Sequence, residues 1–460
     1  MITLHRRIQC LQSYLQQRKL LLLFDSVPNP RGRRGRRWQL GSLLSAALLT
    51  MALLARSLRR AEQLTADLSS SRLFRRLGIR RRVPDSTLGD ALAEVPPQAL
   101  LDRLHHQVRT EHRRKSLVPT RLPVGVLALD GKAREVRDEA QTPFYCQQQN
   151  AEGSPPHYIY RVRGATLISS AAAVCVHQKP IPAWTNEMGY AREFFHELCQ
   201  AYSRLSLFEI VTSDAGVLSR EHCGELDARG FGYVVALKGN NPDLEREARQ
   251  LFEPIVLEQR PVAEDDGWEP DSSRGWIKRQ LWTSTELAGW PGWEHLRQLW
   301  LVRVLGCDGK DGPVRVIEER LYVTNLPVAH RVRGNVNLTL VRAPVRATRP
   351  CRRRPLRELS LSLVLAVART IENELHGTLD IQLREDDGNW VRRGYGLINT
   401  GLLRAMAYNL LAIARSVHLR AERLVPWQQL RDWLRDAIIW PVWLAGGCPV
   451  APEVGSVVPA

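Results

Sequence analysis

Two aspartates in the sequence each follow a short apolar segment. Asp130 comes directly after the segment 123–129, and Asp214 follows the segment 208–212 with one serine between them. Apolar, β-prone runs of this length predict buried strands, and in open α/β sheets ligands gather at the carboxyl ends of the strands. A single aspartate in such a place is most often a turn or cap residue. A pair flanked by small residues instead favours a shared site for a hard cation such as Mg²⁺, which takes oxygen ligands.

A third carboxylate is expected on a helix further along the chain. Glu372 and His376 are four residues apart and therefore share one helical face. Ile371, Leu375 and Leu379 line another face, which would pack on the sheet. A glutamate on an amphipathic helix is commonly just solvated, so Glu372 is a candidate only together with the two aspartates. The His-Glu-x-x-His pattern of zinc peptidases and the Walker spacing of phosphate-binding loops are absent from the sequence.

The segments around the two aspartates alternate between strand and helix patterns. Alternation of this kind predicts an α/β core. The expected strands are 123–129, 158–162, 165–176, 208–212 and 231–237, and the expected helices are 193–205 and 220–229.

The regions on either side of this core have different patterns. Apolar residues recur at three- and four-residue spacing from Gln39 to about Lys115, which predicts a helical region after a possible first helix. Residues 245–330 place six tryptophans among alternating stretches, which predicts a β-rich insertion. Residues from 359 onward are mainly helical, with an apolar stripe at Leu402, Leu403, Met406, Leu410 and Leu411. We therefore divide the chain into 1–118, 119–244 (the first part of the core), 245–330, 331–445 and a flexible tail at 446–460.

The chain is strongly basic. Its formal net charge is +17, and all but seven of its 65 basic residues are arginines. Such a surplus indicates a polyanionic partner, because each neutralised phosphate releases condensed counterions. Part of the charge is concentrated at 31–37, 72–82 and 331–357. Glycines and prolines break regular structure in the first cluster, so it is either a solvated loop or an arm that contacts phosphate through Arg33, Arg34, Arg36 and Arg37.

Cysteine spacing and hydropathy argue against several classes of protein. Eight cysteines in 460 residues include no Cys-x-x-Cys pair, which argues against a disulfide framework and against a structural zinc site. The uncharged segment 40–55 has only 16 residues and contains Ser42, Ser45 and Thr50. A membrane span needs ~20 mostly apolar residues. We therefore expect a buried helix in this segment and a cytoplasmic protein.

Short motifs are distributed over nearly the whole chain. They are Asp25–Trp38, Val83–Leu88, Leu129–Lys132, Asn186-Glu187, Val211–Ala215, Tyr233–Asn240, Tyr322–Pro327, Ile371–His376 with Leu379-Asp380, Arg384–Asp386 and Arg404–Leu411. In this order they resemble the DDE transposases of bacterial insertion sequences. The resemblance is to the branch of that family whose RNase H-like core carries a β-rich insertion before the catalytic glutamate.

The resemblance implies a catalytic triad of Asp130, Asp214 and Glu372 in an α/β fold with an RNase H-like mixed sheet flanked by helices. The triad would hold two Mg²⁺ ions, for which Mn²⁺ can substitute, one activating water for attack on a phosphodiester and one stabilising the leaving oxygen. The freed 3′-OH would then attack target DNA. Lys132 and Lys238 would contact phosphate, unless they are ordinary surface lysines. The implied partner is double-stranded DNA at two element ends, bound by a homodimer associated with the nucleoid.

The sequence departs from this family just before Ile371. Relatives carry a short Arg-x-His-Trp-like segment there, whereas residues 344–370 separate Leu340–Ala343 from Ile371 and the His-Trp pair is missing. An insertion or a stretch read in a shifted frame would displace Glu372, and a displacement of about 1 Å can cost ~10²-fold in rate. The alternative is a family variant with a longer basic loop.

Two other functions compete with an active transposase. A catalytically inactive relative would keep the fold and the charge and would bind DNA without cleaving it. A structural RNA-binding protein would also explain the charge, but not the paired aspartates at strand ends.

Overall fold

The computed structural model describes residues 4–18, 23–32, 36–122, 124–136, 144–148, 157–213, 219–239, 241–265, 267–271, 275–307, 312–327, 390–420 and 425–440. The divergent segment 344–370, the predicted helical pattern between 359 and 389, and the tail at 446–460 lie outside these ranges.

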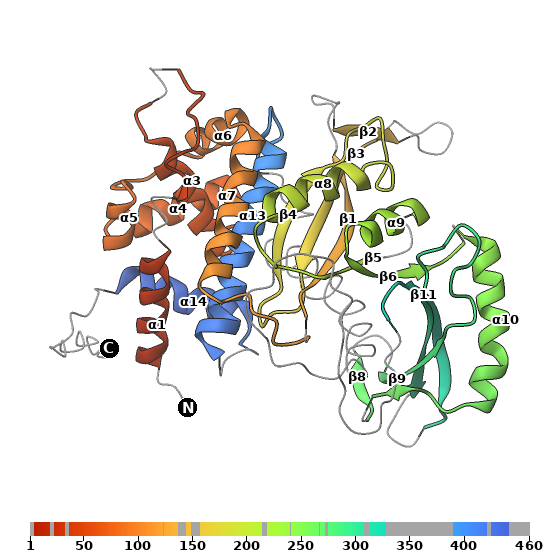
Figure 1. Cartoon of the computed structure of the whole chain (residues 1–460). Helices are drawn as coiled ribbons and strands as arrows, with labels where there is room; N and C mark the ends of the chain where they lie inside the picture. The colour runs from red at the N-terminus through yellow and green to blue at the C-terminus, as the bar shows by residue number, and fades with distance from the viewer. Residues whose placement is uncertain are drawn as a thin grey trace.

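Eleven strands within the described ranges form one mixed β-sheet (Figure 1). Their bounds are β1 Val126–Val136, β2 Tyr145–Gln148, β3 His157–Leu167, β4 Val174–Pro180, β5 Ile210–Ser213, β6 Gly232–Leu237, β7 Ala263–Glu264, β8 Glu269–Asp271, β9 Gly275–Ser284, β10 Gln298–Cys307 and β11 Arg315–Thr324. The order is β2-β3-β1-β5-β6-β11-β10-β9-β7, with β4 also paired to β3 and β8 to β9. The β1–β5 and β5–β6 pairs are parallel, and the remaining pairs are antiparallel.

Most of the predicted core strands are confirmed, but the prediction of one strand over 165–176 is wrong. β3 runs on to Leu167, and β4 begins only at Val174. Between them the chain leaves the ladder, and the carbonyl oxygen of Ser169 accepts a 3.0 Å hydrogen bond from the backbone N–H of Thr120. The carbonyl group of Ser169 thus finds its partner outside the sheet, in the segment that contains Thr120. The apolar run 165–176 therefore divides into the end of β3 and the start of β4, which are antiparallel.

Two helices connect the parallel strands. Helix α8 (Ala191–Tyr202) lies between β4 and β5 in the chain, and helix α9 (Arg220–Ala228) lies between β5 and β6, as predicted. Phe194 and Leu198 of α8 are fully buried in the main apolar core. A second, smaller core lies on the other face of the sheet. Both faces of the central strands are thus covered, which explains their almost continuous apolar sequences.

The predicted helical region is confirmed and combines both ends of the chain. Its members are α1 (Leu4–Gln17), α3 (Leu40–Ala52), α4 (Leu58–Leu68), α5 (Arg72–Arg76), α6 (Asp85–Glu94), α7 (Pro97–Arg113), α13 (Gly396–Ile413), the π-helical turn η3 (Ala414–His418) and α14 (Trp427–Ile439). Figure 1 shows α1 beside α14 and α13 beside α3 and α7, and these pairs are in contact. Helices α7 and α13 also pack on β4, which joins this region to the sheet.

The region 245–330 is only partly β-rich. Helix α10 (Pro242–Glu258) occupies its first part, with Leu244, Ala248 and Phe252 buried at the spacing of a helical face. The strands that follow extend the central sheet, because β11 pairs with β6. The tryptophan-rich stretch therefore continues the same sheet. Helix α10 precedes it in the chain and lies beside this end of the sheet (Figure 1).

One helical stretch of the described residues has the length and apolar character of a membrane span. It is Gly396–His418, and its apolar window is completely buried inside the protein. Every residue of α13 is buried, including Asn399, Arg404 and Asn409, so burial extends around the whole helix beyond the predicted stripe at Leu402–Leu411. Buried polar side chains need hydrogen-bond partners, and Asn399 donates to the carbonyl oxygens of Leu92 and Val95.

Candidate active site

Asp130 lies in the middle of β1, where the parallel pairing of β1 with β5 stops. The expectation that this strand ends at residue 129 is wrong, because β1 continues to Val136 through its pairing with β3. In the β1–β5 pair, Leu129 is opposite Ser213, the last residue of β5. Asp130 is half-buried, and its Oδ1 accepts a 2.8 Å hydrogen bond from the backbone N–H of Gly131. A carboxylate in this place meets the geometry expected for a ligand site of an α/β sheet.

Side-chain alternation assigns Asp130 to one face of β1. Val126 and Ala128 belong to the smaller core, so Asp130 and Lys132 continue on that face. Lys132 is half-buried, with its Nζ atom enclosed. Thr212 pairs with Ala128 and shares the face, and its hydroxyl is buried without a hydrogen-bond partner among the described residues. The face therefore holds a carboxylate, an ammonium group and an unsatisfied hydroxyl.

A buried arginine lies on the opposite face. Arg163 of β3 is opposite Gly131, has no exposed surface, and its Nη1 donates a hydrogen bond to the carbonyl oxygen of Glu187. The Glu187 carboxylate lies directly against Gly131, where a methyl group would overlap with it. Glycine at position 131 is thus needed for the close approach of Glu187 to β1.

The charge of Arg163 is balanced by carboxylates from both faces. Burial lowers the pKa of Arg163 to about 10, while the negative charges of Glu187 and Asp130 act in the opposite direction. Arg163 also lies over the ring of Phe194, with its guanidinium carbon 5.3 Å from the ring centroid. A pKa of about 10 keeps the guanidinium protonated at neutral pH. Arg163 therefore attracts the carboxylates of Glu187 and Asp130 toward the middle of β1.

The remaining predicted basic residues lie at the surface. Lys238 is exposed and follows β6, whose carboxyl end lies at the same edge of the sheet as that of β5. Arg36 and Arg37 are exposed as well. Arg36 donates a 3.0 Å hydrogen bond from Nε to the carbonyl oxygen of Arg31, so this contact lies within the basic arm itself.

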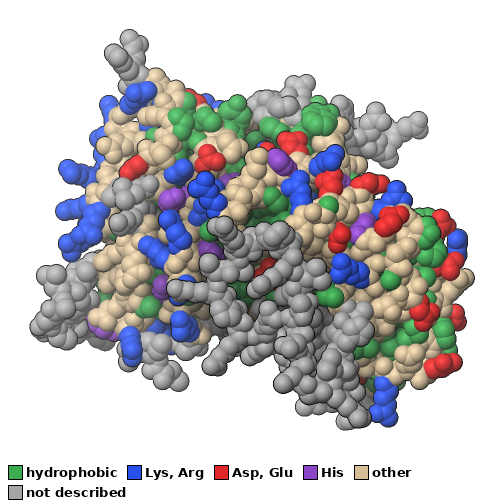
Figure 2. Space-filling view, viewed as in Figure 1, with side chains coloured by type: hydrophobic (Ala, Val, Ile, Leu, Met, Phe, Trp, Pro, Cys, Tyr) green, Lys and Arg blue, Asp and Glu red, His purple; other side chains and the backbone are tan. Residues whose placement is uncertain are grey.

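A larger basic surface covers the outer side of the helical region. Figure 2 shows Lys and Arg side chains gathered over α5. Its exposed residues are Arg72, Arg75, Arg76, Arg80, Arg81 and Arg82. Arg82 is paired with Glu62 at 3.1 Å. This is the second of the three clusters seen in the sequence.

Several predicted site residues lie outside the described ranges: Asp214, Glu372, Arg33 and Arg34. Of the predicted triad, the structure therefore describes only Asp130. Within the described part of the chain, no group of three or more His, Cys, Asp or Glu side chains is placed to hold a metal ion.

The sequence contains only partial signals for the contact on the α8 face. Glu187 belongs to the motif Asn186-Glu187, which by itself indicates no role for the carboxylate. Arg163 was missed because a single arginine in a strand normally indicates an exposed position. The small residue next to Asp130, Gly131, was the available signal, since glycine marks close approach of another group.

Searches against protein-family models and among curated proteins find no match to this chain. What the site can do chemically must therefore be judged from its own residues. It offers the half-buried carboxylate of Asp130, which the buried cation Arg163 attracts. Lys132 lies on the same strand as Asp130, and Lys238 follows β6. Such a site suits a ligand that is itself anionic and bound through a cation or through lysine.

Proposed function

We propose that the chain is a DNA transposase that cleaves the ends of an insertion sequence and joins them to target DNA. The observation that carries this proposal is the position of Asp130 in the middle of β1, one residue beyond the point where β1 pairs with the last residue of β5. Asp214 is the residue that follows Ser213 in the sequence. Asp130 and Asp214 therefore follow two residues that are paired across adjacent parallel strands, and carboxylates supplied in this way suit phosphodiester chemistry with divalent cations.

The strand order supports the finer assignment of the fold. Strands β1, β3 and β4 form an antiparallel meander, and β5 and β6 then add in parallel on the other side of β1. This is the arrangement expected of an RNase H-like core. In the proposal, the strands from β11 to β7 are the insertion, and the helices on both sides of the core form the DNA-binding and C-terminal parts.

The donor atoms on the Asp130 face fit a hard cation. Carboxylate and hydroxyl oxygens are the ligands that Mg²⁺ takes, and Asp130 and Thr212 supply one of each. Mg²⁺ held by Asp130 together with Asp214 and Glu372 would supply Lewis-acid activation of water and stabilise the leaving oxygen.

The protein's own residues have three tasks in this proposal. Lys132 and Lys238 hold DNA phosphates beside the cleaved bond through charge-assisted contacts. Arg163 and Glu187 are positioning residues. They hold the part of β1 that carries Asp130, and so they position the Asp130 carboxylate. The exposed arginines around α5 bind phosphates further along the duplex, which accounts for the location of much of the surplus charge.

The experiment is a cleavage assay on DNA that carries the terminal inverted repeats found beside the gene. We expect strand breaks at the repeat ends that depend on Mg²⁺ and disappear in Asp130→Asn. The divergent sequence at 344–370 favours one second candidate, a relative that binds DNA but no longer cleaves it. Binding of the repeat ends by the native chain without cleavage under any Mg²⁺ or Mn²⁺ condition would establish that candidate instead.

A further inference from the structure

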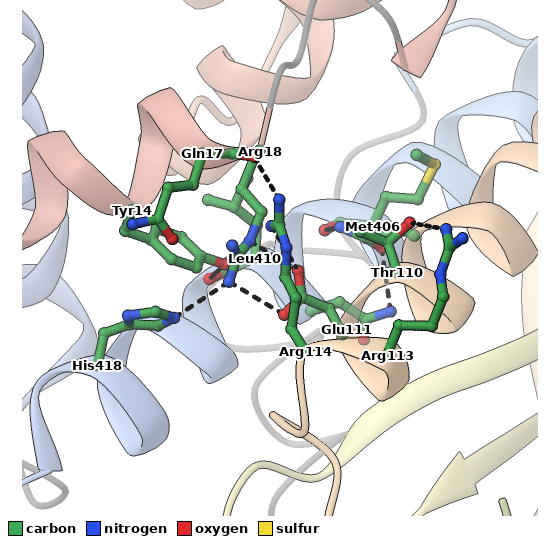
Figure 3. A network of polar contacts seen from close by, with 12 residues as sticks. Tyr14, Gln17, Arg18, Thr110, Glu111, Arg113, Arg114, Met406, Leu410 and His418 are labelled. Atoms are coloured by element: carbon green, nitrogen blue, oxygen red, sulfur yellow. Dashed lines mark hydrogen bonds and ion pairs between the residues drawn. The ribbon is translucent and has the colours of Figure 1, made fainter.

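Helices α1 and α7 and the turn η3 enclose a second polar cluster, far along the chain from Asp130. We call it the Arg18 cluster and define it by Tyr14, Arg18, Glu111, Arg114 and His418 (Figure 3). η3 is a π-helical segment at the end of α13. Such segments occur frequently at functional sites.

Arg18 is almost entirely enclosed. Its side chain is 7% exposed and that of Glu111 is 2% exposed, with 2.6 Å between Arg18 Nε and Glu111 Oε1. Nη2 donates a 3.0 Å hydrogen bond to Glu111 Oε2 and lies 3.1 Å from His418 Nε2. Nη1 is buried and has no hydrogen-bond acceptor among the described residues. A guanidinium donor in such a place costs free energy unless an acceptor reaches it.

A cavity of about 220 Å³ has Arg18 among its lining residues. It is larger than the roughly 150 Å³ that holds a benzene molecule and smaller than most drug-sized pockets, so it suits a small ligand. Its lining includes Arg18, Thr110, Arg113, Arg114 and Leu410. Arg113 and Arg114 keep donor capacity, because each guanidinium has five N–H groups. Arg113 donates one hydrogen bond to Thr110, and Arg114 donates one to Gln17 and lies 3.8 Å from Glu111.

The net charge around the cavity is positive. Arg18, Arg113 and Arg114 carry three positive charges against the single carboxylate of Glu111. Burial, followed by the charges of Arg18 and Arg114, lowers the pKa of His418 to about 4, so His418 is neutral and its Nε2 can accept from Arg18. The surplus is therefore carried by guanidinium groups, which match the oxygens of phosphate and carboxylate.

We propose that this cavity binds a phosphate-type oxyanion, with the buried charge of Arg18 attracting it and with Arg113 and Arg114 as hydrogen-bond donors. The bound anion would connect α1 to α7, and so link the start of the chain to the helix that packs on the sheet. The phosphate can belong to a free phosphate or phosphomonoester, or to the backbone of bound DNA. The proposal does not depend on transposase activity.

The test is isothermal titration of the full chain with inorganic phosphate at constant ionic strength, with chloride as the reference anion. We expect one saturable site. In Arg113→Gln/Arg114→Gln the affinity should fall by at least about tenfold, because two charge-assisted donors are lost. Arg246→Gln on α10 removes an exposed charge far from the cavity along the chain and should leave the affinity unchanged.

The buried charge of Arg18 needs a separate variant, because Arg18→Gln alone would leave Glu111 without its partner. Arg18→Met/Glu111→Met removes the pair together and is expected to keep the fold while losing phosphate binding. A folded double variant that binds phosphate as the native chain does would overturn the proposal, as would the absence of saturable binding to the native chain.

A duplex of about 20 base pairs, used as a competitor, identifies the source of the phosphate. Displacement of inorganic phosphate by the duplex assigns the site to the DNA backbone. Simultaneous binding of both assigns it to a free phosphate or phosphomonoester.

Discussion

Arg163 and Arg18 are both buried arginines that approach a glutamate, yet they lie in different settings. Arg163 lies in the sheet, has no exposed surface, and is influenced by Glu187 and by Asp130. Arg18 lies at the end of α1 between helices, is paired with Glu111, and lines a cavity.

The difference between these two regions concerns the groups that surround each cation. The carboxylates that act on Arg163 come from β1 and from the segment before α8, so its charge orders the part of β1 that carries Asp130. Arg18 pairs with one glutamate and lines a cavity together with two further arginines, so positive charge exceeds negative charge there. The groups around each buried arginine therefore distinguish a positioning role from a ligand site.

The largest effect on stability is expected from Arg18→Met. Removing the guanidinium leaves the Glu111 carboxylate buried and uncompensated, which costs about 3–5 kcal/mol in the free energy of unfolding. The double variant Arg18→Met/Glu111→Met should recover most of that loss, because an apolar pair can replace a buried ionic pair. Urea denaturation measures both variants, and equal destabilisation of the two would show that the pair itself stabilises the helical region.

The next effect concerns the sheet region and is smaller. Gly131→Ala should destabilise the protein by up to about 1 kcal/mol, because the new methyl group overlaps with the Glu187 carboxylate, which is the end of a flexible side chain and can move aside. Gly164→Ala on the neighbouring strand is the matched control, since its Cβ would have only an ordinary contact at 3.9 Å with the carbonyl oxygen of Asp130. Urea midpoints compare the two variants. Equal midpoints would contradict the close approach of Glu187 to β1.

Acid should weaken the joint between the two regions. His105 of α7 and His177 of β4 are hydrogen-bonded at 2.8 Å, and burial lowers the pKa of His105 to about 4 and that of His177 well below its usual value. Between pH 6.5 and pH 4 the unfolded chain therefore binds more protons than the folded one. Stability should fall with decreasing pH, by about 1.4 kcal/mol per pH unit for His105.

Urea denaturation at pH 7, 6 and 5 measures this slope, with His105→Gln as the comparison. The variant should lose stability less steeply as the pH falls. An identical slope in both proteins would mean that other groups cause the acid sensitivity.

The smallest expected effect is on the salt dependence of DNA binding. Arg75→Gln/Arg76→Gln removes two exposed cations of α5 and should reduce the slope of log K against log salt by about 2, since each phosphate contact contributes about 0.9. Arg246→Gln/Arg249→Gln on α10 removes the same charge from the other end of the molecule and should leave the slope unchanged. A reduced slope in the α10 variant alone would show that the DNA-binding surface lies outside the helical region.

The sequence allowed the local elements to be predicted better than their connections. Asp130 and the strands around it follow from apolar runs that end in a polar residue. The prediction over 165–176 failed because Ser169 uses its carbonyl in a contact with Thr120, which lies far away in the sequence. The four-residue spacing of Leu244, Ala248 and Phe252 predicts helix α10. The tryptophan-rich stretch that follows it instead favours strands for the whole region.

The two buried arginines could not be predicted from local patterns. Nothing in the residues adjacent to Arg163 distinguishes it from an exposed strand arginine, because its partners come from the segment before α8. The pairing of Arg18 with Glu111 joins residues 93 positions apart. Their burial depends on the tertiary packing of α1, α7 and α8, which periodicity does not encode.

The most direct test of the central claim is Mg²⁺-dependent cleavage of the element's end DNA by the native chain and by Asp130→Asn, at equal DNA binding. We predict strand breaks at the repeat ends with the native chain and none with Asp130→Asn, while both proteins bind the ends alike. Cleavage by Asp130→Asn at the native rate would contradict the assignment of Asp130 as the central carboxylate.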